Sequence, residues 1–321
     1  MKPAVAVLIP CFNEEATVAK VVSDFRAVLP EAVIYVYDNN SSDRTAVEAA
    51  RAGATVRREP WIGKGRVVRR MLADVDADVY LLVDGDDTYL AKDGLRLIRR
   101  LVDEQLDMVV GSRARTPGAY RSGHALGNLL LTRTVAFLFG DRFTDMLSGY
   151  RALSRRFVKS YAAVLSSGFE IETEITVHAL EIRVPVAEEP VDYAPRPAGS
   201  RSKLRTVQDG ARIALAILLL LELVRPFLVF GSAFLLLAGG SLALAFPILQ
   251  TYLETGLVPR FPTAILATGM MLLGFLSLGC GVILDNVSRG RRELKRLFYL
   301  ASCAEAERRV REGLGATRPA G

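Results

Sequence analysis

The run LLVDGDDTYL, residues 81–90, is an apolar stretch that ends in three carboxylates. Asp84, Asp86 and Asp87 would repel one another by roughly 1 kcal/mol or more per close pair unless a cation or hydrogen-bond donors neutralise them. Carboxylate oxygens are ligands that hard divalent cations prefer. The run therefore predicts half of a site, whose other half is not in the sequence.

Other polar residues follow other apolar runs in the first third of the chain. PCFNEE follows VAVLI, Asp38 ends VIYVYD, and the turn Gly63-Lys64-Gly65 precedes a helical pattern. Up to about residue 111, short β-rich runs alternate with helical ones, which predicts a mostly parallel, Rossmann-like α/β sheet with helices on its faces. Ligands of such sheets bind outside the carboxyl ends of the strands. We therefore expect these polar residues to share one edge.

Two long uncharged segments follow the predicted sheet. No charged residue lies between Arg225 and Glu254 or between Arg260 and Asp285, and each gap exceeds the roughly 20 residues that a helix needs to cross a bilayer. We expect transmembrane helices at 226–248 and 262–284. The expected organisation is a catalytic domain at 1–210, an interfacial amphipathic helix at 211–225, the two spans, and a basic tail at 289–321.

Positive charge gathers beside these two segments. The net charge is +6, and its position favours anionic headgroups of a membrane as the partner rather than nucleic acid. Basic residues flank the outer ends of the spans, whereas the connecting loop is nearly uncharged; they are Arg201, Lys203, Arg205, Arg212 and Arg225 before, and Arg289, Arg291, Arg292, Lys295 and Arg296 after. This predicts a multi-pass protein of the cell (inner) membrane with the catalytic domain and both termini cytoplasmic. Glycine-bearing runs such as LLAGGSLA could also pack against a second subunit as a homo-oligomer.

One interpretation uses the acidic run alone. An apolar strand followed by Asp-x-Asp-x-Thr is the nucleophile motif of haloacid-dehalogenase-like phosphatases, in which Asp84 would attack a phosphoryl group and Asp86 would act as acid and base. That motif normally ends the first strand of its domain. Here three strand-like runs precede it, which disfavours the phosphatase.

The second interpretation uses the upstream motifs as well. IPCFNEEATV, VYDNNSSDRT, the Gly-Lys-Gly turn and Asp-Gly-Asp occur in that order after successive runs. This combination resembles the family 2 glycosyltransferases, which have the nucleotide-sugar-binding A-type fold. VVGSR, DMLSGYR and RPAGSRSKL, followed by the surface helix and two spans, resemble the polyprenyl-phosphate glycosyltransferases, relatives of dolichyl-phosphate mannose synthase.

The resemblance implies a site for a nucleotide-sugar donor. Asp38, with Asn39 and Asn40 behind it, can hydrogen-bond the base or ribose, although the family pattern usually has a second acid where this chain has Asn39. For Asn13 and Glu14, capping of the first helix is an alternative role. Trp61 could stack on a ring, with packing as the default. The donor-binding residues implied are Pro10, Asn13, Glu14, Asp38, Lys64, Asp84, Gly85 and Asp86.

A divalent cation, Mg²⁺ or Mn²⁺, is expected against the donor diphosphate. Asp86 is the expected direct ligand, Asp84 faces the sugar or supports the metal, and Thr88 supplies a hydroxyl or a water contact. Asp87 is interpreted as a contributor to the acidic run or as a cap for the helix that begins near Ala91. The catalytic residues implied are Asp84, Asp86 and Arg113.

The acceptor implied by the resemblance is polyprenyl phosphate. Its second pKa of about 6 leaves it mostly dianionic and already nucleophilic at neutral pH, so no strong base is required. The phosphate-binding residues implied are Arg113, Arg196, Ser200 and Lys203, whereas Arg201 and Arg205 are expected to contact headgroups. Ser148, Gly149 and Tyr150 either shape this pocket or form an ordinary loop, and Glu170 or Glu172 is expected to reach the site.

These observations predict inverting, metal-dependent transfer of a sugar from a nucleotide diphosphate, with a UDP-hexose favoured, to polyprenyl phosphate. The first alternative is a processive polysaccharide synthase of the same fold. Such a synthase usually needs more spans and a Gln-x-x-Arg-Trp motif, and the single tryptophan here is Trp61. The phosphatase that uses Asp84 is the second alternative.

Overall fold

The computed structural model describes residues 3–113, 122–140, 143–161, 171–194, 215 and 217–315. The chain divides into two compact units. The first unit comprises Met1–Gly210 with Leu294–Gly321, and the second comprises Ala211–Glu293.

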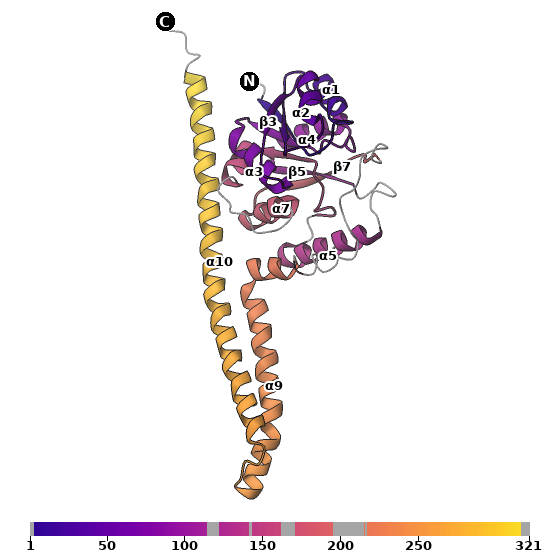
Figure 1. Cartoon of the computed structure of the whole chain (residues 1–321). Helices are drawn as coiled ribbons and strands as arrows, with labels where there is room; N and C mark the ends of the chain where they lie inside the picture. The colour runs from indigo at the N-terminus through magenta and orange to yellow at the C-terminus, as the bar shows by residue number, and fades with distance from the viewer. Residues whose placement is uncertain are drawn as a thin grey trace. The chain divides into compact units, whose positions relative to one another are not determined.

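The described part of the first unit contains a seven-stranded sheet in the order β3-β2-β1-β4-β6-β5-β7 (Figure 1). The strands are β1 (Val5–Cys11), β2 (Val33–Asp38), β3 (Thr55–Arg58), β4 (Val79–Leu82), β5 (Met108–Ser112), β6 (Arg151–Ser154) and β7 (Val186–Pro190). Strand β6 runs antiparallel to its neighbours β4 and β5, and the other pairs are parallel. The predicted mostly parallel, Rossmann-like sheet is therefore confirmed.

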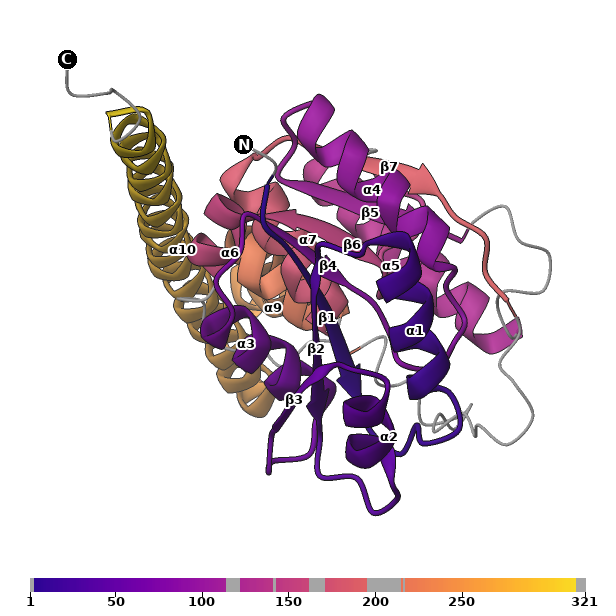
Figure 2. The same cartoon turned by 90° about the horizontal axis from the view of Figure 1, so that it is seen from above.

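Helices cover both faces of this sheet, so the central strands are buried on both sides. Figure 2 shows α1, α2 and α4 on one face and α3, α6 and α7 on the other. Val7 and Ile9 of β1 pack in one core cluster with Val22 and Phe25 of α1. The helices are α1 (Val18–Val28), α2 (Thr45–Arg51), α3 (Lys64–Asp74), α4 (Ala91–Asp103), α5 (Ser122–Phe139), α6 (Arg155–Tyr161) and α7 (Ile171–Ile182).

The reversed direction of β6 decides where the DMLSGYR segment lies. Arg151, the first residue of β6, pairs with Leu82, the last residue of β4. The loop that leads into β6 therefore arrives at the edge where the parallel strands end. The DMLSGYR segment precedes β6, yet it lies at the same sheet edge as the segments that follow β1, β2 and β4.

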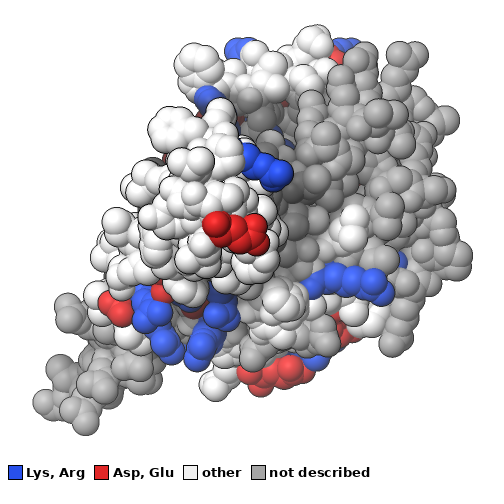
Figure 3. Space-filling view, turned by 90° about the horizontal axis from the view of Figure 1, so that it is seen from below, with Lys and Arg blue, Asp and Glu red and all other residues white. Residues whose placement is uncertain are grey.

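The second unit contains one long apolar helix and the apolar part of another, whose residues from Leu294 onwards belong to the first unit. α9 (Pro226–Thr255) and α10 (Phe261–Gly315) are both long and apolar enough to cross a membrane. Their large side chains are mostly exposed, as for Leu236, which is 77% exposed. Figure 3 shows mostly uncharged surface where the described residues are seen from below. α10 continues through Gly315, so the tail predicted from residue 289 is helical that far; of the predicted interfacial helix, the described residues 215 and 217–224 are helical.

His178 on α7 is a core residue, at 1% exposure. Its ring lies 5.4 Å from the ring centroids of Phe157 and Tyr161. Its Nε2 atom lies 3.0 Å from Ser160 Oγ, and Nδ1 has no hydrogen-bond partner among the described residues. Burial, helped by the positive charge of Lys295, lowers the pKa of His178 to about 3.

This depressed pKa predicts a loss of stability in mild acid. The unfolded imidazole takes up a proton near its ordinary pKa of about 6.5 and the folded one does not, so the stability is complete above that value and falls by up to about 1.4 kcal/mol per pH unit below it. We expect the midpoint of thermal unfolding in detergent to drop between about pH 7.5 and 5.5, and to drop less in His178→Gln. Equal drops in the two proteins would contradict this assignment.

Candidate active site

Four carboxylates from three segments lie around Cys11. Cys11 ends β1 and pairs in register with Asp38, which ends β2. Burial raises the pKa of the Cys11 thiol well above its ordinary value, and the negative charges of Glu14, Asp38, Asp84 and Asp86 raise it further. The structure thus brings the ends of β1, β2 and β4 together, as their shared direction predicts.

Lys64 bridges Asp84 and Glu172, a carboxylate that comes much later in the chain. Its Nζ atom lies 2.5 Å from Asp84 Oδ1 and 2.6 Å from Glu172 Oε1. Burial favours the neutral amine, but the two carboxylates outweigh burial and raise the pKa of Lys64. Lys64 therefore carries a firm positive charge at the first residue of α3. Of the two glutamates considered from the sequence, Glu172 reaches the site and Glu170 lies outside the described residues.

Asp86 is oriented by its own turn. The side chain is buried, at 3% exposure, and its Oδ1 atom accepts hydrogen bonds from Thr88 Oγ1 at 2.6 Å and from Thr88 N at 3.3 Å. Thr88 therefore directs the Asp86 carboxylate. A Cβ atom on Gly85 would lie 2.5 Å from Cys11 Sγ, so the glycine between the two acids is required by close packing.

Asp87 has a different partner from the one considered from the sequence. Its carboxylate pairs with Lys20 Nζ at 2.8 Å. The N-cap of α4 is Leu90, which makes no side-chain capping bond. The interpretation of Asp87 as a helix cap is therefore wrong, because the backbone at Asp87 has a positive φ of 57° and its side chain turns towards α1.

Asn39 anchors the loop that carries the Gly-Lys-Gly turn. Its Nδ2 atom donates to the carbonyls of Glu59 at 3.3 Å and Trp61 at 2.7 Å, and its Oδ1 atom accepts from Gly63 N at 2.7 Å. An ionised acid at this position could not donate to these two carbonyls. Trp61 is 68% exposed and lies under the Arg66 guanidinium, 5.8 Å from the ring centroid, so the expectation that it packs in the core is wrong.

The remaining donor-side residues line the same loops. Asp38 accepts from Ser41 N at 3.2 Å, and Asn13 bonds the same loop through Ser41 Oγ and Ser42 N, each at 2.9 Å. The N-cap of α1 is Thr17, without a side-chain capping bond. Asn13 therefore ties two loops together instead of capping α1.

Two more donor-side residues belong to β1 and to the loop after it. Glu14 lies in this loop, and its backbone N donates to Thr45 Oγ1 at 2.8 Å. Pro10 pairs in register with Tyr37 within the sheet.

Arg113 is held by a buried acid that the sequence did not single out. Its Nε and Nη2 atoms lie 2.7 and 2.9 Å from the two oxygens of Asp145, which is fully buried. The guanidinium carbon also lies 5.3 Å from the ring centroid of Tyr193. The only sequence signal for Asp145 is its place at the start of DMLSGYR. Arg196, Ser200 and Lys203, with Arg201 and Arg205, lie outside the described residues.

In the loop before β6, two residues belong to the core and one faces the acidic site. Ser148 and Tyr150 are fully buried; Ser148 Oγ lies 3.2 Å from Tyr89 Oη, and Tyr150 Oη donates to the carbonyl of Leu90 at 3.0 Å. Gly149 instead faces Asp84, because a Cβ atom there would lie 2.5 Å from Asp84 Oδ2. Of these three residues, Gly149 is the one that shapes the acidic site.

Arg151 fixes this loop from behind. The side chain is fully buried and donates from Nε to the carbonyl of Ser148 at 2.9 Å, from Nη2 to the carbonyl of Met146 at 2.7 Å, and from Nη1 to Thr176 Oγ1 at 2.8 Å. A buried guanidinium is tolerated when its donors are satisfied in this way. Arg151 thus ties the loop to α7.

The acidic site offers oxygen ligands to a cation. The described residues contain no group of three or more His, Cys, Asp or Glu side chains arranged to hold a metal. Asp84 and Asp86 supply carboxylates, and Mg²⁺ in phosphoryl sites typically uses one or two carboxylates with phosphate oxygens and water. The residues fit a cation that binds together with a diphosphate.

A solved structure shares this fold. Glucosyl-3-phosphoglycerate synthase from Mycobacterium tuberculosis, crystallised with Mn²⁺, UDP and glucosyl-3-phosphoglycerate, is similar with a TM-score of 0.53 and 21% sequence identity over 68% of this chain and 79% of that chain. At this identity the likeness supports the fold, an A-type glycosyltransferase sheet.

Sequence relatives extend the likeness to nearly the whole chain. Glycosyltransferase AglJ of Haloferax volcanii is 34% identical over 301 residues, which cover 92% of this chain and 98% of the relative. A dolichyl-phosphate hexose transferase of the same organism is 28% identical over 66% of this chain and 91% of the relative. The family described as glycosyl transferase family 2 matches residues 6–161, the segment that carries the acidic site. The chain belongs to glycosyltransferase family 2.

Proposed function

We propose that this glycosyltransferase transfers a hexose from a UDP-sugar to polyprenyl phosphate at the cytoplasmic face of a membrane, with inversion at the sugar. The observation that carries the proposal is the combination, in one chain, of a family 2 catalytic unit and two helices long and apolar enough to cross a membrane. An acceptor with a lipid tail accounts for both parts. The relative named dolichyl-phosphate hexose transferase supports this class of acceptor.

The donor would bind along the ends of β1, β2 and β4. Asp38 can accept hydrogen bonds from the base or ribose. Asp84 and Asp86, which lie near the same Cys11, would face the diphosphate and sugar. A Mg²⁺ or Mn²⁺ ion on Asp86 would supply positive charge that stabilises the departing nucleoside diphosphate. The Mn²⁺ and UDP in the similar synthase structure support this kind of donor complex.

Positive side chains would bring the two anionic substrates together. Lys64 carries its charge beside Asp84, at 2.5 Å from the carboxylate, and Arg113 presents a guanidinium, which can bind a phosphate in a bidentate manner. The acceptor phosphate is mostly dianionic at neutral pH and attacks the anomeric carbon directly. The bond to the nucleoside diphosphate breaks on the opposite side, so a single displacement inverts the configuration.

The orientation follows from charge beside the apolar helices. Arg289, Arg291 and Arg292 follow the charge-free part of α10, and Lys and Arg collect on the cytoplasmic side of membrane proteins. This charge pattern supports a cytoplasmic position for the catalytic unit.

The proposal is tested by assaying the detergent-solubilised chain. The assay supplies polyprenyl phosphate, Mn²⁺ or Mg²⁺, and radiolabelled UDP-glucose, a UDP-uronic acid or GDP-mannose in parallel. We expect one label per lipid in the chloroform phase with one of the UDP-sugars, and an inverted anomeric configuration by NMR. Label in a polymer of many sugars would favour the processive synthase, and no lipid-linked sugar with any donor would overturn the proposal.

A further inference from the structure

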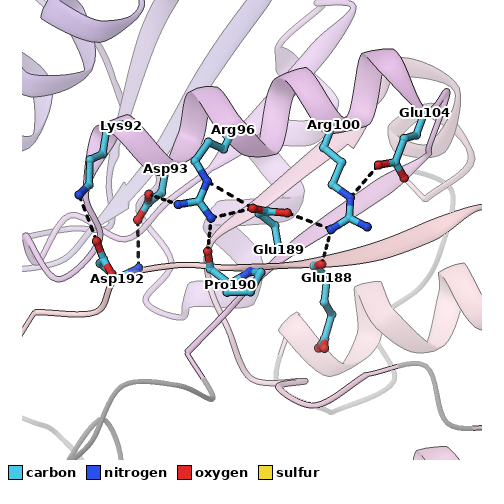
Figure 4. A network of polar contacts seen from close by, with 9 residues as sticks. All are labelled: Lys92, Asp93, Arg96, Arg100, Glu104, Glu188, Glu189, Pro190 and Asp192. Carbon is cyan, nitrogen blue, oxygen red and sulfur yellow. Dashed lines mark hydrogen bonds and ion pairs between the residues drawn. The ribbon is translucent and has the colours of Figure 1, made fainter.

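Two adjacent glutamates on β7 point to opposite faces of the sheet. Neighbouring side chains of a strand alternate between faces. Figure 4 shows Glu189 turned towards α4 and the carboxylate of Glu188 turned away from it. Glu189 accepts from Arg96 Nη2 at 2.6 Å and pairs with Arg100 Nη1 at 2.9 Å.

Glu188 instead holds the loop that contains Asp145. Its Oε1 atom accepts from Thr144 N at 2.7 Å and from Asp145 N at 3.0 Å, and its Oε2 atom accepts from Thr144 Oγ1 at 2.7 Å. Hydrogen bonds to a charged acceptor are among the stronger ones, at about 1.5–3 kcal/mol each. Three such bonds on two consecutive residues fix this part of the backbone.

The same backbone segment positions Arg113. Asp145 accepts from Nε and Nη2 of Arg113 and also from its backbone N at 3.1 Å. Both side chains are largely enclosed, with exposures of 13% for Arg113 and 0% for Asp145. Any shift of the Asp145 backbone therefore moves the carboxylate that determines the guanidinium plane.

Two arginines of α4 hold the backbone of β7 in place. Among the described residues, β7 pairs with β5 alone, so one edge of the strand lacks a neighbouring strand. Arg100 Nη1 donates to the carbonyl of Glu188 at 2.6 Å and Arg96 Nη2 to that of Pro190 at 2.5 Å (Figure 4). These arginines hold the backbone from which Glu188 extends.

We propose that Glu188 is a positioning residue for the acceptor site: through the Asp145 backbone it holds Arg113 in the orientation that binds the acceptor phosphate. The inference rests on the proposed function of Arg113. The Glu189 carboxylate contacts α4 and not the Asp145 loop, and Arg96 and Arg100 donate to the β7 carbonyls directly, so removal of this carboxylate is expected to affect stability more than the position of Glu188.

Glu188→Ala and Glu189→Ala form a matched pair for the test. We expect Glu188→Ala to raise the KM for polyprenyl phosphate about tenfold, the equivalent of about 1.4 kcal/mol, while the KM for the sugar donor stays within about twofold. Glu189→Ala is expected to lower the midpoint of thermal unfolding and to leave both KM values unchanged. Glu188→Gln keeps an oxygen acceptor for both N–H groups and should restore most of the acceptor affinity.

A chemical readout separates this inference from the proposed function. Phenylglyoxal reacts with arginine side chains, and mass spectrometry of the Arg113 peptide measures its extent. We expect faster modification of Arg113 in Glu188→Ala than in Glu189→Ala or the unchanged chain, whichever reaction the enzyme catalyses. Equal modification in all three, or an equal change of acceptor KM in both alanine variants, would overturn the inference. If Glu188→Ala does not fold, Thr144→Val removes one of the three bonds and should show a smaller increase in modification.

Discussion

Replacing Asp86 with alanine is expected to lower the rate of sugar transfer by about 100- to 1000-fold, because a metal ion supplies several kcal/mol of charge stabilisation to the transition state. Asp86 is the buried acid of the DGD turn, and Thr88 orients its carboxylate. Losing the carboxylate removes the protein ligand that would hold the cation against the diphosphate. The rate of lipid-linked sugar formation at saturating donor measures the effect.

Asp87→Ala is the matched control for this variant. Asp87 lies next to Asp86, but its carboxylate pairs with the largely exposed Lys20, and such pairs contribute about 0–1 kcal/mol to stability. Transfer by Asp87→Ala should therefore stay close to that of the unchanged chain. Both variants should retain the circular dichroism spectrum of the folded protein. Full activity in Asp86→Ala would refute the assignment of the metal ligand.

Gly149→Ala is expected to abolish most transfer while the chain stays folded. The added methyl group would lie 2.5 Å from Asp84 Oδ2 and 3.0 Å from its Cγ, closer than non-bonded atoms approach. A rotation of Asp84 away from this methyl group would disturb its ion pair with Lys64, which lies 2.5 Å from its other oxygen. The displaced carboxylate would no longer face the donor, and we expect a loss of about 100-fold, the cost of a small misplacement in an active site.

The control for Gly149→Ala is a glycine with space around it. A Cβ atom on Gly290 would meet no other atom within 4 Å, and an alanine is favourable in a helix. Gly290→Ala should therefore keep full activity. Thermal unfolding of Gly149→Ala within a few degrees of the unchanged chain would show that the loss is local. Activity of Gly149→Ala within about twofold of the unchanged chain would contradict the prediction, because the position of Asp84 would then not matter for the reaction.

The sequence predicted the catalytic edge because periodicity and strand direction are local signals. β1, β2 and β4 are short apolar runs followed at once by polar residues, and parallel strands bring their ends to one edge. Asp38 and the acids that end β4 could therefore be grouped without a structure. The uncharged segments before Glu254 and Asp285 predicted long helices in the same way, since length and apolar composition suffice.

The supporting residues could not be found because their partners are distant in the chain. Arginine side chains are usually exposed, so the burial of Arg151 against Thr176 can be seen only in the fold. Glu172 was one of two glutamates expected at the site, but its partner Lys64, more than a hundred residues away, was not predicted. Asp145 meets Arg113 through a loop that follows α5. Asn39 seemed a weakened donor ligand, whereas it holds the loop from Glu59 to Gly63.

The bridge from Lys64 to Asp84 and Glu172 makes folding of the chain independent of cation binding. An ammonium group already balances Asp84 from within the chain, so the protein need not acquire a divalent ion to become compact. A divalent cation would then belong to the substrate complex and would bind together with the donor diphosphate. A lysine side chain, unlike a fixed metal, can also swing from a carboxylate to an incoming phosphate. The resting enzyme thus balances part of the negative charge of this pocket with a counter-ion that is tethered to the chain.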